Sequence, residues 1–328
     1  MKKKYLYLAV IITVLFISGC ENLYNDAYDS SNPNVYVAGY EITRGGSYDN
    51  ALYWKNGSIN RLTNYAGSVM KYAKANSVFV YNRKAYIAGV DDGNAFYSID
   101  SGDIINLTNG SEAKSVYVYD GDVYIAGVGT SSNPLLWKNN ESVALDISLD
   151  TYANSVFVYN GNIHLVGSEV SGATIAYYWL NGSKSSFAGS TPHTVNSVFV
   201  YNNDVYAAGS VNSLKACYWK NSSTVNQLSA IQSVAYSVFV YDGDVYVAGY
   251  ILEGNMKAVY WKNSEIVYLS QNKSSANSIF VYNGDVYVAG YELHGSYELA
   301  QYWKNGKVVT LYNENHNSAA TSIFVSDE

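Results

Sequence analysis

Short runs of Val, Phe, Tyr and Ala alternate with Asn, Asp and Gly along most of this chain. The clearest example is Ser237–Gly249 (SVFVYDGDVYVAG), where two apolar runs flank Asp242-Gly243. β-Branched and aromatic residues in short runs favour strands, because they pack well on a pleated surface. An Asp-Gly pair between such runs favours a two-residue type I′ turn, in which both residues have positive φ. The pattern therefore predicts a β-hairpin.

The hairpin pattern is repeated along the chain. Similar copies begin at five further serines: Ser77, Ser115, Ser155, Ser197 and Ser278. The Gly that ends each VYVAG-like run falls at positions 39, 89, 127, 167, 209, 249 and 290, at intervals of 38 to 50 residues. A second pattern, Ala-x-Tyr-Trp-Lys-Asn-Gly or a near copy, follows each hairpin except at Ala95–Gly102 and carries all six Trp. A period near 40 residues with four short strands is typical of a β-propeller blade.

The two ends of the repeat region complement each other. The first copy has the VYVAG strand, Val35–Gly39, but no SVFVY strand before it, whereas the chain ends with an SVFVY start at residues 322–325. Pairing these segments would close a ring and remove two unpaired sheet edges, which otherwise invite aggregation. Because successive side chains face opposite sides of a strand, large neighbours such as Tyr53 and Trp54 require both faces of each sheet to be covered. We therefore predict an all-β fold, a seven-bladed β-propeller over residues 34–328 closed by residues 322–325.

The order of apolar strand, Asn/Asp-Gly turn, VYVAG strand, variable loop and Tyr/Trp strand resembles the kelch type of β-propeller repeat across residues 34–328. The repeats are also similar to those of bacterial surface lipoproteins that carry VYVAGYE…YWKNG segments. The kelch resemblance implies that SVFVY is the innermost strand of each blade, an order that the pattern alone leaves open. Both resemblances concern architecture and imply no particular activity.

The first residues have the features of an export signal. Lys2-Lys3-Lys4 precede a mostly apolar run, Tyr5–Ile17, which is short for a membrane span of about 20 residues. Ser18-Gly19 before Cys20 resembles a bacterial lipobox, which implies cleavage before Cys20 and a lipid on its thiol. We therefore expect a lipoprotein signal peptide at 1–19. The alternatives are an ordinary signal peptide or an uncleaved anchor.

Residues 20–33 are polar and would tether the lipid on Cys20 to the propeller. Several acyl chains hold a protein stably at a membrane surface, so the membrane is an expected partner. Glu21, rather than Asp, follows the Cys, and in bacterial lipoproteins this generally does not imply retention at the inner membrane. We expect a location in the bacterial cell envelope, at the outer membrane or the cell surface.

The charge of the chain argues against nucleic-acid binding. Removing residues 1–19 would take away three of the 20 Lys and Arg and none of the 27 Asp and Glu, so the net charge moves from −7 to −10. Binding to a phosphate backbone requires concentrated positive charge, and no basic cluster occurs outside the export signal. With Cys20 acylated, Cys217 stands alone, so neither an intrachain disulfide nor a Cys-rich metal site is expected.

The connections between the predicted strands indicate where a ligand could bind. In an up-and-down blade they alternate between two faces, so the short, uniform Asn/Asp-Gly turns share one face and the variable loops share the other. Variable loops on a rigid scaffold are where binding sites usually lie. Tyr offers contact area at a low entropic cost, although the same Tyr could simply pack at strand ends. The candidate ligand-binding residues on this face are Tyr40, Glu41, Tyr250, Tyr291 and Glu292.

Sequence patterns for catalysis are weak. His164 takes the Tyr position of a VYVAG-like run, which indicates a half-buried structural imidazole. His193, His294 and His316 lack metal-ligand spacing, and neither G-x-S-x-G nor H-E-x-x-H occurs. Cys217 is expected to be a buried, inert thiol. We predict no catalytic residue, metal site or cofactor.

The sequence therefore predicts a membrane-anchored, non-catalytic binding or adhesion scaffold for a protein or a glycan. One alternative is a propeller enzyme that acts on glycans as a hydrolase or lyase, which would need carboxylates that converge in the central funnel. A second alternative is a periplasmic scaffold in envelope assembly.

Overall fold

The computed structural model describes residues 33–42, 49–63, 71–146, 151–169, 175–187, 193–211, 214–312 and 316–327. The predicted signal peptide at 1–19 and all but the last residue of the predicted tether at 20–33 lie outside these ranges. Pro33–Glu328 forms one compact unit, and every buried core residue of the described ranges belongs to it. The regular structure in these ranges consists of strands alone, and they contain no helix able to cross a membrane.

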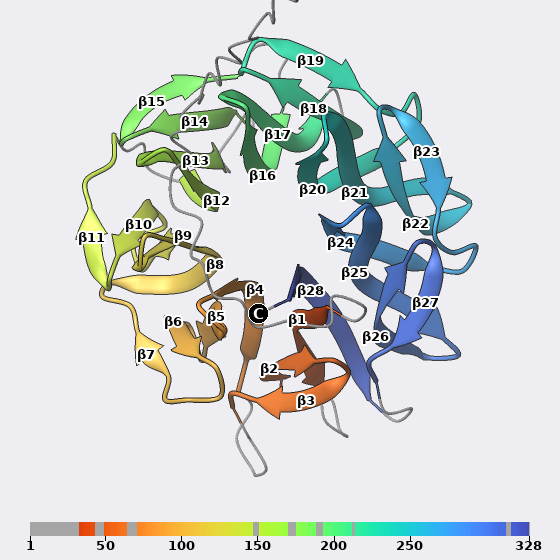
Figure 1. Ribbon diagram of the computed structural model, residues 1–328, viewed down its shortest axis with the longest axis horizontal. Helices are drawn as coiled ribbons and strands as arrows, with labels where there is room; N and C mark the ends of the chain where they lie inside the picture. The colour runs from red at the N-terminus through yellow and green to blue at the C-terminus, as the bar shows by residue number, and fades with distance from the viewer. Residues whose placement is uncertain are drawn as a thin grey trace, which may run out of the picture. The chain divides into compact units, whose positions relative to one another are not determined.

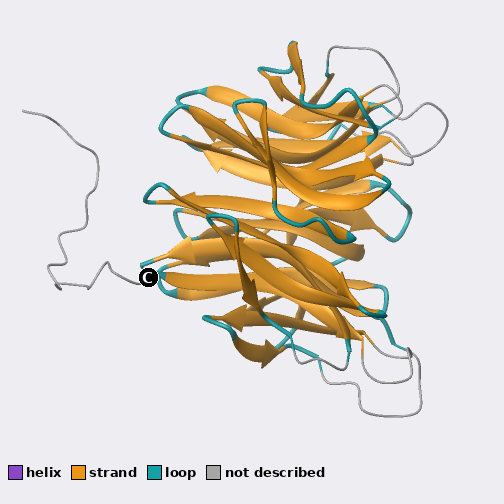
Figure 2. Ribbon diagram, turned by 90° about the vertical axis from the view of Figure 1, so that its right-hand side faces the viewer, coloured by secondary structure: helices purple, strands orange, loops and turns teal. Residues whose placement is uncertain are grey.

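Seven four-stranded antiparallel sheets, here called blades 1 to 7, are arranged around a central axis (Figures 1 and 2). The innermost strands of blades 1 to 7 are β28 (Asn317–Ser326), β4 (Ala73–Tyr81), β8 (Gly110–Tyr119), β12 (Thr151–Tyr159), β16 (His193–Tyr201), β20 (Ser233–Tyr241) and β24 (Ser274–Tyr282). The second strands are β1 (Asn34–Ile42), β5 (Lys84–Asp91), β9 (Asp122–Gly129), β13 (Asn162–Glu169), β17 (Asp204–Val211), β21 (Asp244–Glu253) and β25 (Asp285–His294). The third strands are β2 (Asp49–Lys55), β6 (Asn94–Ile99), β10 (Pro134–Lys138), β14 (Ala176–Leu180), β18 (Lys215–Lys220), β22 (Asn255–Lys262) and β26 (Tyr297–Lys304). The outer strands are β3 (Ser58–Arg61), β7 (Ile105–Asn106), β11 (Glu141–Val143), β15 (Ser183–Ser186), β19 (Thr224–Gln227), β23 (Glu265–Tyr268) and β27 (Lys307–Thr310).

The ring is closed by the C-terminal strand. β28 pairs antiparallel with β1, with Val35 opposite Val325 and Val37 opposite Ile323. Blade 1 therefore takes its innermost strand from the end of the chain and its other three from the beginning (Figure 1). The predictions of seven blades and of closure by residues 322–325 are confirmed. The SVFVY strands are innermost, as the kelch resemblance implied.

The short turns lie together on one face of the ring, here called the turn face. The turn residues have positive φ, for example 49° at Asp242 and 82° at Gly243, as a type I′ turn requires. On the same face, the Lys262 ammonium lies 2.8 Å from Asp244. Hydrogen bonds from Lys262 and Asn263 lower the pKa of the Asp244 carboxyl. The opposite face, which carries the longer connections, is called the loop face.

The core lies between neighbouring blades and covers both faces of each sheet. Trp303 of blade 7 packs in a cluster with residues of blade 6, whereas the adjacent Tyr302 packs against the cluster shared with blade 1. Blade 2 is the exception. Ser98 stands opposite Ile87 at the Trp position, and Phe96 is fully buried in the cluster between blades 1 and 2. Adjacent large side chains thus stabilise opposite inter-blade interfaces, as the Tyr-Trp pattern predicted.

The Gly of each VYVAG-like run has a packing role. A Cβ on Gly249 would overlap the carbonyl oxygen of Val234 in the neighbouring inner strand. The same overlap with an inner-strand carbonyl would occur at the equivalent glycines, which are Gly39, Gly89, Gly127, Gly167, Gly209 and Gly290. The innermost and second strands of every blade therefore approach each other so closely that only glycine fits.

Candidate functional site: the central cavity of the loop face

Each of the seven inner strands contains a β-bulge near the loop face. In blade 6, for example, Ala235 and Ser237 pair with consecutive residues of β21, so that Tyr236 is the extra residue. A bulge leaves its extra residue outside the ladder and changes the direction of its side chain. The seven extra residues all line one central cavity of about 430 Å³. They are Asn76, Lys114, Asn154, Asn196, Tyr236, Asn277 and Thr321.

Most of these side chains also join neighbouring blades. The Nδ2 group of Asn196 donates to the carbonyl oxygen of Ala235 at 2.8 Å, and Asn154 and Asn277 make the equivalent bond. The Thr321 hydroxyl donates to the carbonyl oxygens of Ala38 and Ala75. Bonds between blades fix these side chains, so the wall of the cavity is preorganised.

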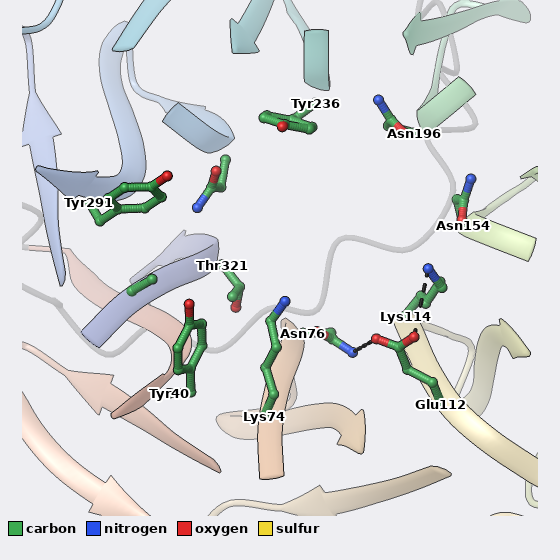
Figure 3. A pocket seen from close by; sticks show the side chains of 12 residues that line it. Tyr40, Lys74, Asn76, Glu112, Lys114, Asn154, Asn196, Tyr236, Tyr291 and Thr321 are labelled. Carbon is green, nitrogen blue, oxygen red and sulfur yellow. Dashed lines mark hydrogen bonds and ion pairs between the residues drawn. The ribbon is translucent and has the colours of Figure 1, made fainter. Parts of the chain in front are cut away.

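One wall of the cavity carries charged groups from β4 and β8. Lys114 Nζ lies 3.7 Å from a Glu112 carboxylate oxygen, and Asn76 donates to that carboxylate at 2.9 Å. Lys74 Nζ lies 5.6 Å from the centre of the Tyr40 ring, a distance suited to a cation–π contact. Figure 3 shows Lys74, Glu112 and Lys114 on neighbouring strands at one side of the cavity. This wall offers two ammonium groups and one paired carboxylate.

Tyrosines form much of the remaining lining, from Tyr40 beside Lys74 to Tyr236 across the cavity (Figure 3). Tyr40, Tyr236 and Tyr291 line the cavity from β1, β20 and β25 (Figure 3), and the Tyr250 ring lies 5.9 Å from that of Tyr236. Burial, together with the neighbouring Tyr250 phenol, raises the pKa of Tyr236 to about 12. Burial, Glu298 and the neighbouring phenols also raise the pKa of Tyr291. These hydroxyls therefore stay neutral and can donate hydrogen bonds to a ligand at neutral pH.

The floor of the cavity begins with a closed circle of hydrogen bonds. The Ser237 hydroxyl of blade 6 accepts the backbone N–H of Ile279 in blade 7 at 3.2 Å. Equivalent bonds join every pair of neighbouring blades, including Ser322 of blade 1, which accepts the N–H of Val78. The other five serines in the circle are Ser77, Ser115, Ser155, Ser197 and Ser278. The serine that begins each SVFVY run thus links its blade to the next one by a hydrogen bond.

Seven aromatic rings form a belt below the serines. Neighbouring ring centres are 4.5–4.8 Å apart around the full circle, and neighbouring planes differ by 43–60°. The rings belong to Phe79, Tyr117, Phe157, Phe199, Phe239, Phe280 and Phe324. A second cavity of about 520 Å³ at the turn face is lined by Phe280 and Phe324. The belt therefore lies between the two cavities, and a ligand reaches the upper one from the loop face.

Three of the sequence-predicted candidates gather at this cavity. Tyr40 and Tyr291 line it, and Tyr250 packs behind Tyr236. The two carboxylates do not join them. Glu41 forms a bidentate ion pair with Arg61 of the outer strand β3, at 2.7 and 3.1 Å.

Glu292 is directed into the blade. It is 7% exposed and accepts hydrogen bonds from Asn272 at 2.6 Å and from Gln301 at 3.2 Å. His294 Nε2 lies 3.6 Å from the same carboxylate. This carboxylate stabilises the contact between strands on the loop face and does not line the central cavity.

His164 and Cys217, whose side chains could in principle take part in catalysis, are buried in the fold. Nδ1 of His164 lies 2.8 Å from the Tyr178 hydroxyl, and burial lowers the pKa of this imidazole. Cys217 is buried, and burial raises the pKa of its thiol, so the reactive thiolate is disfavoured. The side chain of His193 lies outside the described residues. Within the described ranges, no group of three or more His, Cys, Asp and Glu is placed to hold a metal ion.

A comparison with solved structures supports the fold. No protein-family model matches the chain, and no curated protein sequence matches it. The β-propeller domain of the trilobed protease from Pyrococcus furiosus is similar at 13% identity and a TM-score of 0.52, over 87% of this chain and 95% of that one. The chain is a seven-bladed β-propeller. The Pyrococcus domain is described as having an open velcro topology, whereas the present ring is closed by β28.

Two further structures are more distant. The computationally designed protein Ika8 is 14% identical over 83% of each chain, with a TM-score of 0.49. The extracellular domain of a B. thetaiotaomicron protein described as a one-component system is 12% identical, with a TM-score of 0.49. That match covers 80% of this chain and 38% of the other.

Several lining residues were not among the sequence-predicted candidates. Lys74, Asn76, Lys114 and Tyr236 lie just before the SVFVY runs, in a region that the pattern assigned to connecting loops. The clue in the sequence was their constant position, directly before or three residues before the Ser that begins each repeat. A bulge interrupts the alternation of a strand, so the pattern did not show that these residues continue it.

Proposed function

We propose that this protein is a lipid-anchored, kelch-like binding scaffold without catalytic activity, and that its central loop-face cavity binds a protein or a glycan. The observation that carries the proposal is the cavity itself. Side chains from all seven blades converge on it, and bonds between blades fix several of them. A rigid concave site with tyrosine, amide and lysine side chains is suited to recognition.

The residues of the cavity favour binding over glycan hydrolysis. Most glycoside hydrolases use two carboxylates, one on each side of the scissile bond. Among the described residues that line the cavity, Glu112 is the single carboxylate, and it is already paired with Lys114 and Asn76. A single carboxylate does not supply the pair that such hydrolysis requires.

A binding screen tests the proposed function. The soluble fragment 21–328, which contains the whole compact unit, is applied to a glycan array and to extracellular-matrix proteins. We expect a specific ligand whose affinity falls at least tenfold in Tyr236→Ala and Tyr291→Ala, since both remove a lining ring. The matched control is Tyr268→Ala, because this tyrosine is exposed on the outer strand β23. Binding that all three variants retain would contradict a role for the cavity. Release of reducing ends from a bound glycan, abolished by Glu112→Gln, would favour the hydrolase alternative.

The proposed anchor depends on Cys20 and places the protein in the bacterial envelope. Wild-type protein is expected in the membrane fraction, cleaved before Cys20 and carrying a lipid, whereas Cys20→Ser is expected to carry none, because it lacks the thiol. Protease treatment of intact cells distinguishes the two orientations. Loss of the protein supports display at the cell surface, whereas protection until the outer membrane is opened favours the periplasmic scaffold. Wild-type protein that is found in the soluble fraction, or that carries no lipid, would contradict lipid anchoring.

A further inference from the structure

The charge of the central cavity is opposite to that of the chain. The sequence has a formal net charge of −7, yet the described cavity lining contains two lysines, Lys74 and Lys114, and one carboxylate, Glu112. A concave site with an excess of one sign of charge attracts ligands of the other sign. The excess of one positive charge in this lining therefore favours an anionic group over a cationic one.

The two lysines are held at the entrance by aromatic faces. Lys74 Nζ lies 5.6 Å from the centre of the Tyr40 ring, and Lys114 Nζ lies 5.4 Å from that of Tyr152. Each ammonium group has three donors, so a lysine that already has a partner can still donate to a ligand. Lys74 extends into the cavity between Tyr40 and Glu112 (Figure 3).

Three tyrosines line the same cavity as the two lysines. Tyr40, Tyr236 and Tyr291 combine flat apolar faces with hydroxyl groups, a combination that suits a ligand with both C–H faces and hydroxyls. Pyranose rings have both. The cavity of about 430 Å³ falls within the usual range for small-molecule sites.

We propose that the cavity binds a negatively charged saccharide, whose anionic group lies against Lys74 and Lys114 and whose pyranose ring packs on Tyr236 and Tyr291. This inference rests on the proposed binding function and specifies its ligand class. A carboxylate and a sulfate would be recognised by the same ammonium groups, because Lys acts as a point charge with rotatable donors.

Matched saccharides provide the test. Calorimetry with the 21–328 fragment compares galacturonate oligomers of two to four residues with their methyl esters, which lack the negative charge. A sulfated tetrasaccharide and pentaglutamate complete the panel. We expect one of the acidic saccharides to bind at least tenfold more tightly than the neutral ester, and its affinity to fall as salt is raised. Whichever of the two binds identifies the anion as carboxylate or sulfate.

Substitutions then assign the preference to the cavity. The double variant Lys74→Gln/Lys114→Gln is expected to bind acid and ester equally. Lys262→Gln, which removes a lysine of the turn face, should keep the tenfold preference. Circular dichroism melting of each variant establishes that the fold is retained, since both substituted cavity lysines are partly exposed.

Three outcomes would overturn the inference. They are equal binding of acid and ester by the wild-type fragment, an acid preference that survives the double variant, and tighter binding of pentaglutamate than of any saccharide. If the array or matrix screen finds a ligand that depends on Tyr236 while the acidic saccharides do not bind, this inference fails and the binding function stands. If neither screen nor panel yields a ligand, both fail.

Discussion

Deletion of residues 321–328 is expected to lower the melting temperature of the propeller by roughly 10 °C. The deletion removes Ile323 and Val325, which are 3% and 1% exposed in the core cluster between blades 7 and 1. Burial of an aliphatic side chain contributes about 1.5–3 kcal/mol. The deletion also breaks the serine circle at Ser322 and opens the aromatic belt at Phe324. A total loss of about 5 kcal/mol follows from the two aliphatic residues alone.

Calorimetric melting of the full and shortened fragments measures this loss. Removal of Asp327 and Glu328 alone is the matched control, because it leaves the pairing between β1 and β28 intact. The control should melt close to the temperature of the parent. A melting curve that the longer deletion leaves unchanged would argue that the closure of the ring contributes little to stability.

Replacement of Gly249 by Ala is expected to destabilise the propeller by about 3 kcal/mol, the upper part of the usual range for overpacking. The new Cβ would overlap the Val234 carbonyl oxygen and lie 3.1 Å from Ala235 Cα. Both obstacles are backbone atoms of the bulged inner strand β20, which cannot rotate away as a side chain could. Relief requires the strand to move, and the strand also carries Tyr236 and Ser237. We therefore expect weaker ligand binding in this variant as well.

Gly243→Ala is the appropriate comparison. Gly243 has a φ of 82° in a turn, and no atom lies within 4 Å of the position that a Cβ would occupy there. Gly243→Ala is expected to destabilise the fold by only about 1 kcal/mol, because alanine must adopt a left-handed backbone conformation there. Chemical denaturation of both variants gives the two free energies of unfolding. Equal values would show that the close approach of the first two strands does not explain the repeated glycine.

The architecture was predictable because each blade repeats the same local rules. Seven glycines at nearly constant intervals predicted the number of blades. The incomplete first and last copies predicted that the ring closes between them. The adjacent large residues Tyr302 and Trp303, which face opposite sides of their strand, indicated that both faces of a sheet are buried. Local pattern and global packing agree at these positions, so the sequence alone was sufficient.

The cavity was less predictable because bulges form most of its lining. Tyr236 and its equivalents belong to strands that begin several residues before the SVFVY runs, and no local pattern announces such an extension. The contacts that make the serine circle and the aromatic belt join residues about 40 positions apart. They become visible only when the order of the strands within a blade is known.

The candidates Tyr40 and Glu41 show how a local rule could have improved the prediction. The sequence pattern placed both in a loop, but β1 continues to Ile42. Adjacent residues of a strand face opposite sides, so Tyr40 lines the cavity while Glu41 reaches Arg61. Tyr291 and Glu292 separate in the same way because β25 continues to His294. In both pairs, the tyrosine and the glutamate point to opposite sides because the strand continues beyond the repeat pattern.

β1 spans the propeller from the turn face to the cavity. Asn34 accepts a hydrogen bond from Asn56, a turn-face residue, at 2.8 Å, whereas Tyr40 near the other end of the same strand lines the cavity. The described chain therefore starts on the turn face, and the mouth of the cavity lies at the opposite end of β1.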